Sequence, residues 1–363
     1  MSIALKELIR QPRRFSAVAV ALTLMVVLLV VLGGFLDGLE LSQTGAYRAH
    51  DNKVLVFAAD ADRQLARSRV DGEAADLVAA DDAVAAVGRL DATFTVAGLP
   101  GEEVEDVALY GYELATARLP EPPAAGEAVV DEQLRRVAGV DVGDTLEIGS
   151  TAEPVTVVAV VDDLTTGAPT VWVAVDEWTR LVALGNPAAV PPEGTSQALV
   201  VEPAADGPAT LAALRADPAL GGVDPVSTGE AIEALDVVQQ QSSTFSGIIS
   251  VTLVVTLLVV ALFFALITLE RVGLYAVLKA LGARTGELLL GVSAQAVVIS
   301  VLALVVGIGL SAAFVALLPP QLPIRVEPTR VLWIAIGVVA TAILGSLFTA
   351  RRLLRIDPAE AIG

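Results

Sequence analysis

The chain has 363 residues, of which 55% are hydrophobic, and its formal net charge is −19. A mean hydropathy of +0.70 is too high for an ordinary soluble domain, so the composition indicates membrane spans rather than the buried core helices of a soluble protein. The sequence has no cysteine, which excludes thiol chemistry, disulfide exchange and cysteine-ligated metals but does not fix the compartment.

The first 14 residues are basic, with four cationic side chains against Glu7. Leu5, Leu8 and Ile9 share one helical face, which predicts an amphipathic helix over 1–14 at the inner membrane surface. The apolar run that follows has about 21 residues and no A-x-A site, whereas a cleavable signal has an apolar core of about 7 to 15. We therefore expect an uncleaved anchor.

Four stretches are long and apolar enough to cross a bilayer, which takes about 20 predominantly apolar residues. The predicted transmembrane helices cover residues 15–36, 245–269, 288–318 and 331–350. Pro319 and Pro320 end the third, which leaves 319–330 as a short outer loop. None of the four predicted spans contains a charged residue.

The charges beside the spans predict the orientation. Residues 1–14, 270–287 and the tail 351–363 each carry net positive charge, which places all three in the cytoplasm by the positive-inside rule. Residues 37–241 then lie outside. They contain 36 acidic and 11 basic residues, a net charge of −25. Both termini are cytoplasmic, as four spans require.

The segment 37–241 predicts an α+β extracytoplasmic domain, inserted between the first and second spans and built of two lobes. Short runs rich in Val and Thr and bounded by Gly, Pro and Asp indicate strands. These runs are KVLVF, TFTVAG, EDVALYGY, DTLEIG, PVTVVAVV, PTVWVAV and SQALVV. Helical patterns lie near 131–137, 175–184 and 209–214. GEAVVDEQLRRVAGVDVGDTLEIG predicts strand, helix, turn and strand.

Residues 230–244 predict a stalk. Ile232, Leu235 and Val238 fall on one helical stripe, and neither Gly nor Pro interrupts the run from Glu230 to Phe245. We expect one continuous helix that enters the second span and carries motion outward, in preference to a passive linker.

No catalytic constellation stands out in the outer segment. His50 is the single histidine, and we expect it to be a surface residue rather than part of a Ser-His-Asp triad. Acidic groups at 60–62, 102–106 and 161–163 lack the spacing of a calcium loop and are predicted to be solvated faces. The sequence has no G-x-x-x-x-G-K-[ST] loop, so we expect no nucleotide hydrolysis by this chain. We predict no catalytic residue, cofactor or metal in it.

The stretch LERVGLYAVLKALGARTGELL, residues 269–289, places charges between two long apolar runs. Leu274, Val277, Leu278 and Leu281 recur at helical spacing, and Gly282 is a favoured helix end. These residues predict a short amphipathic helix within 270–287. Its apolar side fits either the membrane surface or a partner protein, and the pattern does not choose between them.

The same stretch resembles the cytoplasmic loop of the MacB/FtsX-type ABC transporter permeases, which has the pattern E-R-x-x-E-[IL]-A-x-L-[KR]-A-L-G-A. The chain has Glu270, Arg271 and AVLKALGA at 276–283. Its tail RRLLRIDPAEAIG is similar to the family's ending, with DPAEA at 357–361. The basic start and the order of span, large domain and three spans also agree with the family.

The loop also departs from the family's pattern. Leu274 stands where the family has Glu, and Tyr275 stands at an aliphatic position. This version is more similar to the DevC-type exporter permeases than to MacB, so the substrates of MacB are not carried over to this chain.

The resemblance implies that the loop is a coupling helix seated in a separate ATP-binding subunit, which binds ATP and Mg. The residues it assigns to docking are Glu270, Arg271, Leu274, Tyr275, Val277, Leu278, Lys279, Leu281 and Gly282. It further implies a homodimer of permeases with two ATPases in a bacterial plasma membrane. Mechanotransmission to the outer domain for export is the first hypothesis. The alternatives are an FtsX-like regulator of a cell-wall enzyme and a receptor without an ATPase.

Overall fold

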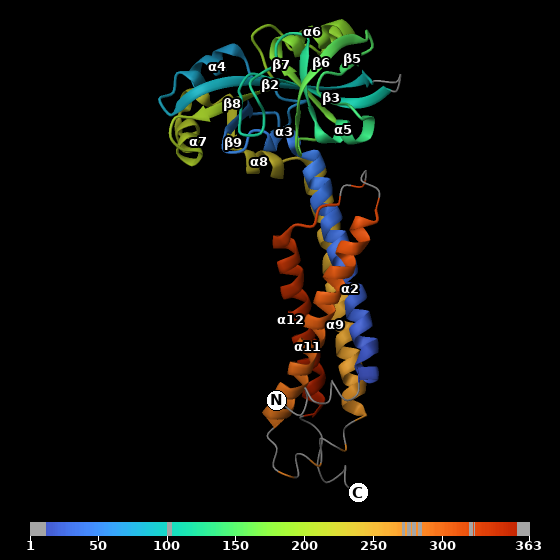
Figure 1. Ribbon diagram of the computed structural model, residues 1–363. Helices are drawn as coiled ribbons and strands as arrows, with labels where there is room; N and C mark the ends of the chain where they lie inside the picture. Colours follow the sequence, from blue (N-terminus) through green and yellow to red (C-terminus); the bar gives the residue numbers. More distant parts are fainter. Residues whose placement is uncertain are drawn as a thin grey trace. The chain divides into compact units, whose positions relative to one another are not determined.

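The computed structural model describes residues 12–99, 104–270, 273, 277, 281, 285–318, 322 and 324–353. The chain divides into two compact units. Met1–Gly38 and Ser242–Gly363 form the first, named here the membrane unit, and Leu39–Gln241 form the second, named the sheet domain. The described parts confirm the predicted fold class, since long apolar helices make up the first and a mixed sheet with short helices makes up the second (Figure 1).

Four helices of the described residues are long and apolar enough to cross a membrane, over Phe15–Gln43, Asp236–Leu269, Leu290–Ala316 and Pro328–Leu347. They belong to α2 (Pro12–Gln43), α9 (Asp236–Leu269), α11 (Thr285–Ala316) and α12 (Pro328–Leu353). These helices correspond to the four predicted spans, but α2 ends later than residue 36 and α9 begins before residue 245. The polar stretches LSQ and QQQSST continue the helices beyond their apolar parts.

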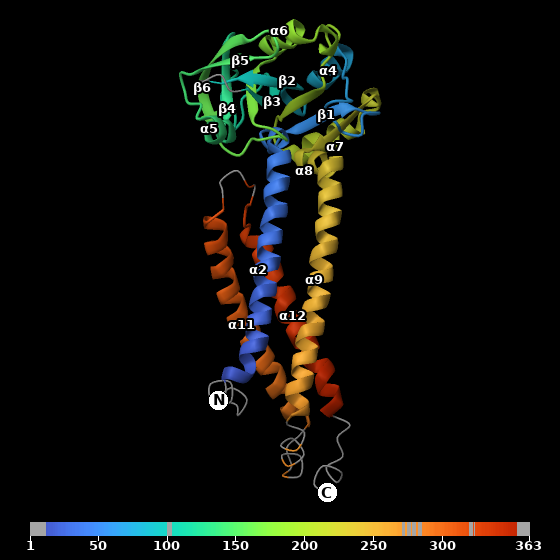
Figure 2. The same cartoon turned by 90° about the vertical axis from the view of Figure 1, so that its right-hand side faces the viewer.

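The four long helices run side by side in the membrane unit (Figures 1 and 2). One buried cluster joins Leu22 of α2, Phe264 of α9 and Ile299 of α11, and a second joins α2, α11 and α12. Glycines permit close approach: a Cβ at Gly307 would lie 2.6 Å from Val26 Cγ1, and one at Gly345 would lie 3.1 Å from the backbone nitrogen of Ala261. Small residues at helix contacts are typical of membrane bundles.

An ion pair links α2 to α12. Asp37 Oδ1 accepts a hydrogen bond from Arg330 Nε, and the Asp37 side chain is 9% exposed. Both residues lie just beyond the predicted spans, 15–36 and 331–350, yet within the helices themselves. The predicted spans 15–36 and 331–350 contain no charged residue, whereas the longer helices α2 and α12 do.

The sheet domain contains nine strands that pair into one sheet. They are β1 (Val54–Ala58), β2 (Val84–Gly98), β3 (Val104–Tyr112), β4 (Glu127–Asp131), β5 (Thr145–Ile148), β6 (Glu153–Val161), β7 (Thr170–Ala174), β8 (Ala198–Pro203) and β9 (Val223–Ser227). The strand order is β3-β7-β4-β6-β5-β2-β8-β1-β9. All the predicted strands are present, while β9 and the first half of β2 were not predicted.

The long strand β2 joins two regions of the sheet. Its second half pairs antiparallel with β3, from Leu90 opposite Tyr112 to Gly98 opposite Val104, and also pairs with β5. These contacts close β2, β3, β7, β4, β6 and β5 into a ring. The first half of β2 pairs with β8, which continues to β1 and β9. The two expected lobes therefore share one continuous strand.

Alternate residues of the ring strands enter two different cores, as the two-residue period of a strand requires. Leu109 of β3 and Val173 of β7 enter one cluster with Trp178. Tyr110 and Trp172, one residue away on the same strands, enter the other cluster. Both faces of these strands are buried, which explains their nearly continuous apolar sequence.

Short helices connect the strands. They are α3 (Gly45–Arg48), α4 (Gly72–Ala79), α5 (Glu132–Ala138), α6 (Val175–Gly185), α7 (Gly207–Ala216) and α8 (Thr228–Glu233), with single 3₁₀ turns at Pro187–Ala189 and Pro218–Leu220. Their ends follow capping rules. Asp131 accepts from the Leu134 N–H at 2.9 Å and starts α5, while Gly139 ends it at a φ of +69°.

Candidate functional site

The predicted docking helix is described at three of its nine assigned residues. Arg271, Leu274, Tyr275, Leu278, Lys279 and Gly282 lie outside the described residues. Gly273 and Val277 have helical backbone, and the Leu281 N–H donates to the Val277 carbonyl at 3.0 Å. Val277 and Leu281 are 48% and 79% exposed. Where it is described, the loop has helical turns and apolar side chains on its surface.

The predicted stalk is not one continuous helix, so that prediction was wrong. Helix α8 ends at Glu233, Ala234 caps it, and α9 begins at Asp236. Ile232 and Leu235 both pack against a core of the sheet domain, on either side of the break at Ala234. The Gln239 amide donates to the Glu233 carbonyl at 2.9 Å and so satisfies an acceptor at the break.

The start of α8 carries a signal in the sequence that the stripe pattern did not use. Ser227 and Glu230 form a capping box, in which each side chain bonds the other residue's backbone N–H. Val238, the third predicted stalk residue, lies in the first turn of α9 and is 7% exposed.

His50 is fully buried, which corrects the expectation of a surface residue. Its Nδ1 lies 2.8 Å from the Ala46 carbonyl, and its ring centroid lies 6.3 Å from that of Trp172. Burial lowers its pKa to about 4, so the ring is neutral. A buried histidine on a backbone carbonyl, packed against an indole, has a structural role.

Acidic groups do not assemble a metal site in the described part of the chain, where no cluster of three or more His, Asp or Glu side chains occurs. Asp62, in one of the acidic groups noted in the sequence, lies 3.0 Å from Arg67 in an exposed ion pair. Glu102 and Glu103 of the second group lie outside the described residues.

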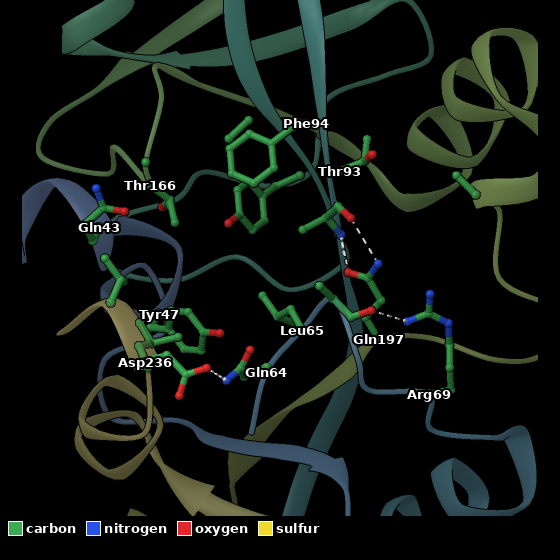
Figure 3. Close-up of a pocket in the computed structure, with 18 residues that line it drawn as sticks. Gln43, Tyr47, Gln64, Leu65, Arg69, Thr93, Phe94, Thr166, Gln197 and Asp236 are labelled. Atoms are coloured by element: carbon green, nitrogen blue, oxygen red, sulfur yellow. Dashed lines mark hydrogen bonds between the residues drawn. The ribbon is translucent and has the colours of Figure 1, made fainter. Parts of the chain in front are cut away.

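A cavity of about 550 Å³ opens in the sheet domain, and its lining residues all belong to that domain (Figure 3). Figure 3 shows Phe94 of β2 on one side, with Tyr47 and Asp236 on the opposite side. Leu65 lies beside Tyr47, and Thr166 comes from the loop between β6 and β7. Sequence patterns gave no sign of this cavity because its walls come from segments up to about 190 residues apart.

The last residue of α2 and the beginning of α9 also line the cavity. Gln43 ends α2, while Leu235, Asp236 and Val237 stand at the α8–α9 junction. The Asp236 carboxylate accepts from the Gln64 amide at 2.7 Å. The helices that carry the first and second predicted spans therefore both contribute to the cavity wall.

Most of the polar groups around the cavity have partners within the protein. The Gln197 side chain bonds both backbone groups of Ala92, at 2.7 Å and 3.0 Å. The Thr166 hydroxyl accepts from the Ala46 N–H at 2.7 Å. Burial raises the pKa of Tyr47 and Tyr110 above that of an ordinary phenol, so both rings remain neutral. The cavity is thus suited to binding and lacks an activated nucleophile.

Residues 246–358 match the family model described as "FtsX-like permease C-terminal". An uncharacterized ABC transporter permease of Mycobacterium bovis is 40% identical over 112 residues, which are 30% of this chain and 31% of that protein. Another, from Mycobacterium tuberculosis (strain ATCC 25618 / H37Rv), is 32% identical over 110 residues, with the same coverage. The chain thus matches about a third of the length of these curated relatives.

Among solved structures, the sheet domain is similar to the periplasmic region of MacB from Actinobacillus actinomycetemcomitans. The TM-score is 0.36 at 13% identity, covering 54% of this chain and 94% of that one. The extracellular domain of YknZ from Gram-positive bacteria gives a TM-score of 0.34 at 13% identity, covering 48% and 100%.

The family match includes the loop 270–287 and the tail residues Asp357 and Pro358, which carried the resemblance in the sequence. The comparison therefore confirms the resemblance to MacB/FtsX-type permeases in the part of the sequence where it was noted. The C-terminal part of this membrane protein thus matches the FtsX-like permease domain and is similar to the MacB/FtsX-type ABC transporter permeases.

Proposed function

We propose that this chain is the membrane subunit of an ABC transporter of the MacB/FtsX type. A separate ATPase subunit binds ATP with Mg²⁺ and hydrolyses it, and this chain couples that hydrolysis to a conformational change of the sheet domain. The change drives export. The complex contains two copies of this chain and two ATPase subunits in a bacterial plasma membrane.

The observation that carries the proposal is the FtsX-like match over 246–358, which includes the loop 270–287 between two apolar helices. Relatives that match 30% of this chain are described as uncharacterized ABC transporter permeases. The exposed Leu281 and Val277 support docking, because large apolar side chains on the surface of a loop favour a protein or membrane partner.

The charges support an arrangement in which the loop faces the cytoplasm and the sheet domain faces outward. The loop carries Arg271, Lys279 and Arg284, whereas the sheet domain carries most of the acidic residues. Movement of an ATPase would displace the loop, and α9 begins the path from the loop towards the sheet domain. In this mechanism the chain binds a partner and transmits a movement.

The docking assignment is tested by Leu281→Asp, with Leu278→Asp as a second variant. Leu281 is 79% exposed, so the substitution leaves the fold of this chain intact. A carboxylate buried at an interface without a partner weakens association by about tenfold or more. Copurification with the ATP-binding subunit and stimulation of its ATPase should both decrease.

Val142→Asp provides the matched control, because Val142 is an exposed apolar residue of the sheet domain. It should leave assembly and ATPase activity unchanged. If the Leu281 and Leu278 variants also assemble and hydrolyse ATP at the wild-type rate, the loop is not the docking element.

A further inference from the structure

We propose that the cavity of the sheet domain binds a small amphipathic organic cation with an aromatic or otherwise apolar body. This goes beyond the proposed coupling of ATP hydrolysis to movement, in which the cavity has no part. Binding requires no ATPase, so the inference stands or fails separately from the proposed function.

The size of the cavity fits such a ligand. Sites for small molecules are concave, mostly apolar and about 300–1,000 Å³ in volume. The main cavity has about 550 Å³, and a neighbouring hollow of about 240 Å³ shares Thr93, Phe94 and Ala189 with it. Phe94 therefore lines both spaces.

The aromatic groups favour an apolar ligand that carries a cation. Phe94 is 70% exposed although it lies in the middle of β2, so its ring presents a face to the cavity instead of filling a core. Tyr47 and Tyr110 supply two further neutral rings, and Tyr110 is supported by Trp172 with ring centroids 4.8 Å apart. The faces of aromatic rings attract organic cations.

The charges at the cavity favour a cation over an anion. Arg69 and Asp236 both line it, at separate places in Figure 3. The Arg69 guanidinium donates to the backbone carbonyl of Ser68 at 2.6 Å and lies on the Gln197 side of the cavity, away from Asp236. Asp236 is bonded by the neutral Gln64 amide, and no ion pair among the described residues includes it. The net charge of −25 on residues 37–241 attracts cations further.

The position of Asp236 connects the ligand to the helices. A cation bound at this carboxylate also contacts Leu235 and Val237, at the junction where α8 ends and α9 begins. Gln43, at the end of α2, lies on the same cavity wall. An occupied cavity therefore restrains the starting turns of α9.

The test measures fluorescence polarisation with the full-length chain in lipid nanodiscs, and empty nanodiscs supply the background. Rhodamine 6G, a xanthene cation, should bind saturably. Fluorescein, a xanthene anion of similar size, should not. Asp236→Asn keeps the acceptor for Gln64 but removes the charge, and it should weaken rhodamine binding by about three- to tenfold. Phe94→Ala should weaken it by about tenfold.

Two exposed positions away from the cavity serve as controls. Asp60→Asn removes a charge and Val104→Ala shortens an apolar side chain, and both should bind rhodamine 6G like the wild type. The proposal is overturned if fluorescein binds as tightly as rhodamine, if neither dye binds saturably, or if the Asp236 and Phe94 variants bind like the controls. All four altered side chains are exposed, so each variant should fold. Thermal unfolding of each variant checks this.

Discussion

His50 lies in the interior of the sheet domain with one ring nitrogen bonded and the other without a partner. Nδ1 contacts the Ala46 carbonyl, whereas Nε2 and the neighbouring Trp172 Nε1 have no hydrogen-bond partner among the described residues. A charged imidazole is costly here, because burial lowers the pKa from an ordinary 6.5 to about 4.

The stability of the sheet domain should therefore depend on the protonation of His50. The unfolded state takes up a proton near pH 6.5 and the folded state only near pH 4, so the stabilisation by the neutral ring is complete above pH 6.5 and is lost as the pH falls towards 4. The full effect is about 3 kcal/mol. The melting temperature of the wild type minus that of His50→Gln should decrease by about 5–10 °C between pH 7.5 and pH 4.5. A difference that is constant with pH would contradict a neutral buried ring.

The burial of a single residue is what the sequence could not predict. His50 belongs to no periodic pattern, and its surroundings come from Trp172 and from Thr228, whose hydroxyl donates to the His50 carbonyl at 2.9 Å. These contacts join residues more than 100 positions apart. The docking residues, in contrast, were assigned from the resemblance of a local motif to the family, and all of them stay a prediction.

Among the elements, α9 shows where pattern reading succeeds and where it fails. The apolar run predicted the span, but nothing in EALDVV breaks a helical pattern, so the interruption at Ala234 was not foreseen. The break appears only in the folded backbone, where Ala234 caps α8 and α9 begins at Asp236. Similarly, β9 contains Pro225, which argues against a central strand but is tolerated because β9 lies at the edge of the sheet.

The break changes how the stalk should be tested. Val238 lies in the first turn of α9, where proline is tolerated, whereas Ser243 lies in the helix interior and is exposed. Ser243→Pro removes a backbone donor and clashes with the preceding turn, at a cost of about 3 kcal/mol or more. ATP hydrolysis by the assembled complex should persist, while the rate of export should decrease.

Ser243→Ala keeps the helix and should have little effect on either activity. Wild-type export by the proline variant would mean that this part of α9 is a passive connection, and the proposed transmission of movement would have to be abandoned.

For the whole molecule, composition and hydropathy predicted four spans and one inserted α+β domain, and both are confirmed. The closure of six strands into a ring was not predictable. It depends on pairing between strands such as β3 and β7, which are about 60 residues apart and leave no mark on local patterns. The membrane orientation rests on charge and stays a prediction.

Single cysteines test the orientation without background from the chain, because the sequence contains none. Cysteines at Ser150 and Ser227 should react with an impermeant thiol reagent in intact cells, since both positions belong to the sheet domain. Cysteines at Thr285 and Ala359 should react only after the cells are opened. Labelling at Thr285 from outside would reverse the assigned topology.

The central claim is that ATP binding by a partner moves the sheet domain relative to the membrane helices, and one distance measurement addresses it directly. Spin labels at Ser150→Cys in the sheet domain and Thr329→Cys in α12 report the distance between the two units. The labelled chain is diluted with unlabelled chain and assembled with its ATPase in nanodiscs. The distance distribution should shift when ATP is bound, and Leu281→Asp should abolish the shift. An unchanged distribution in a complex that hydrolyses ATP would contradict mechanotransmission by this chain.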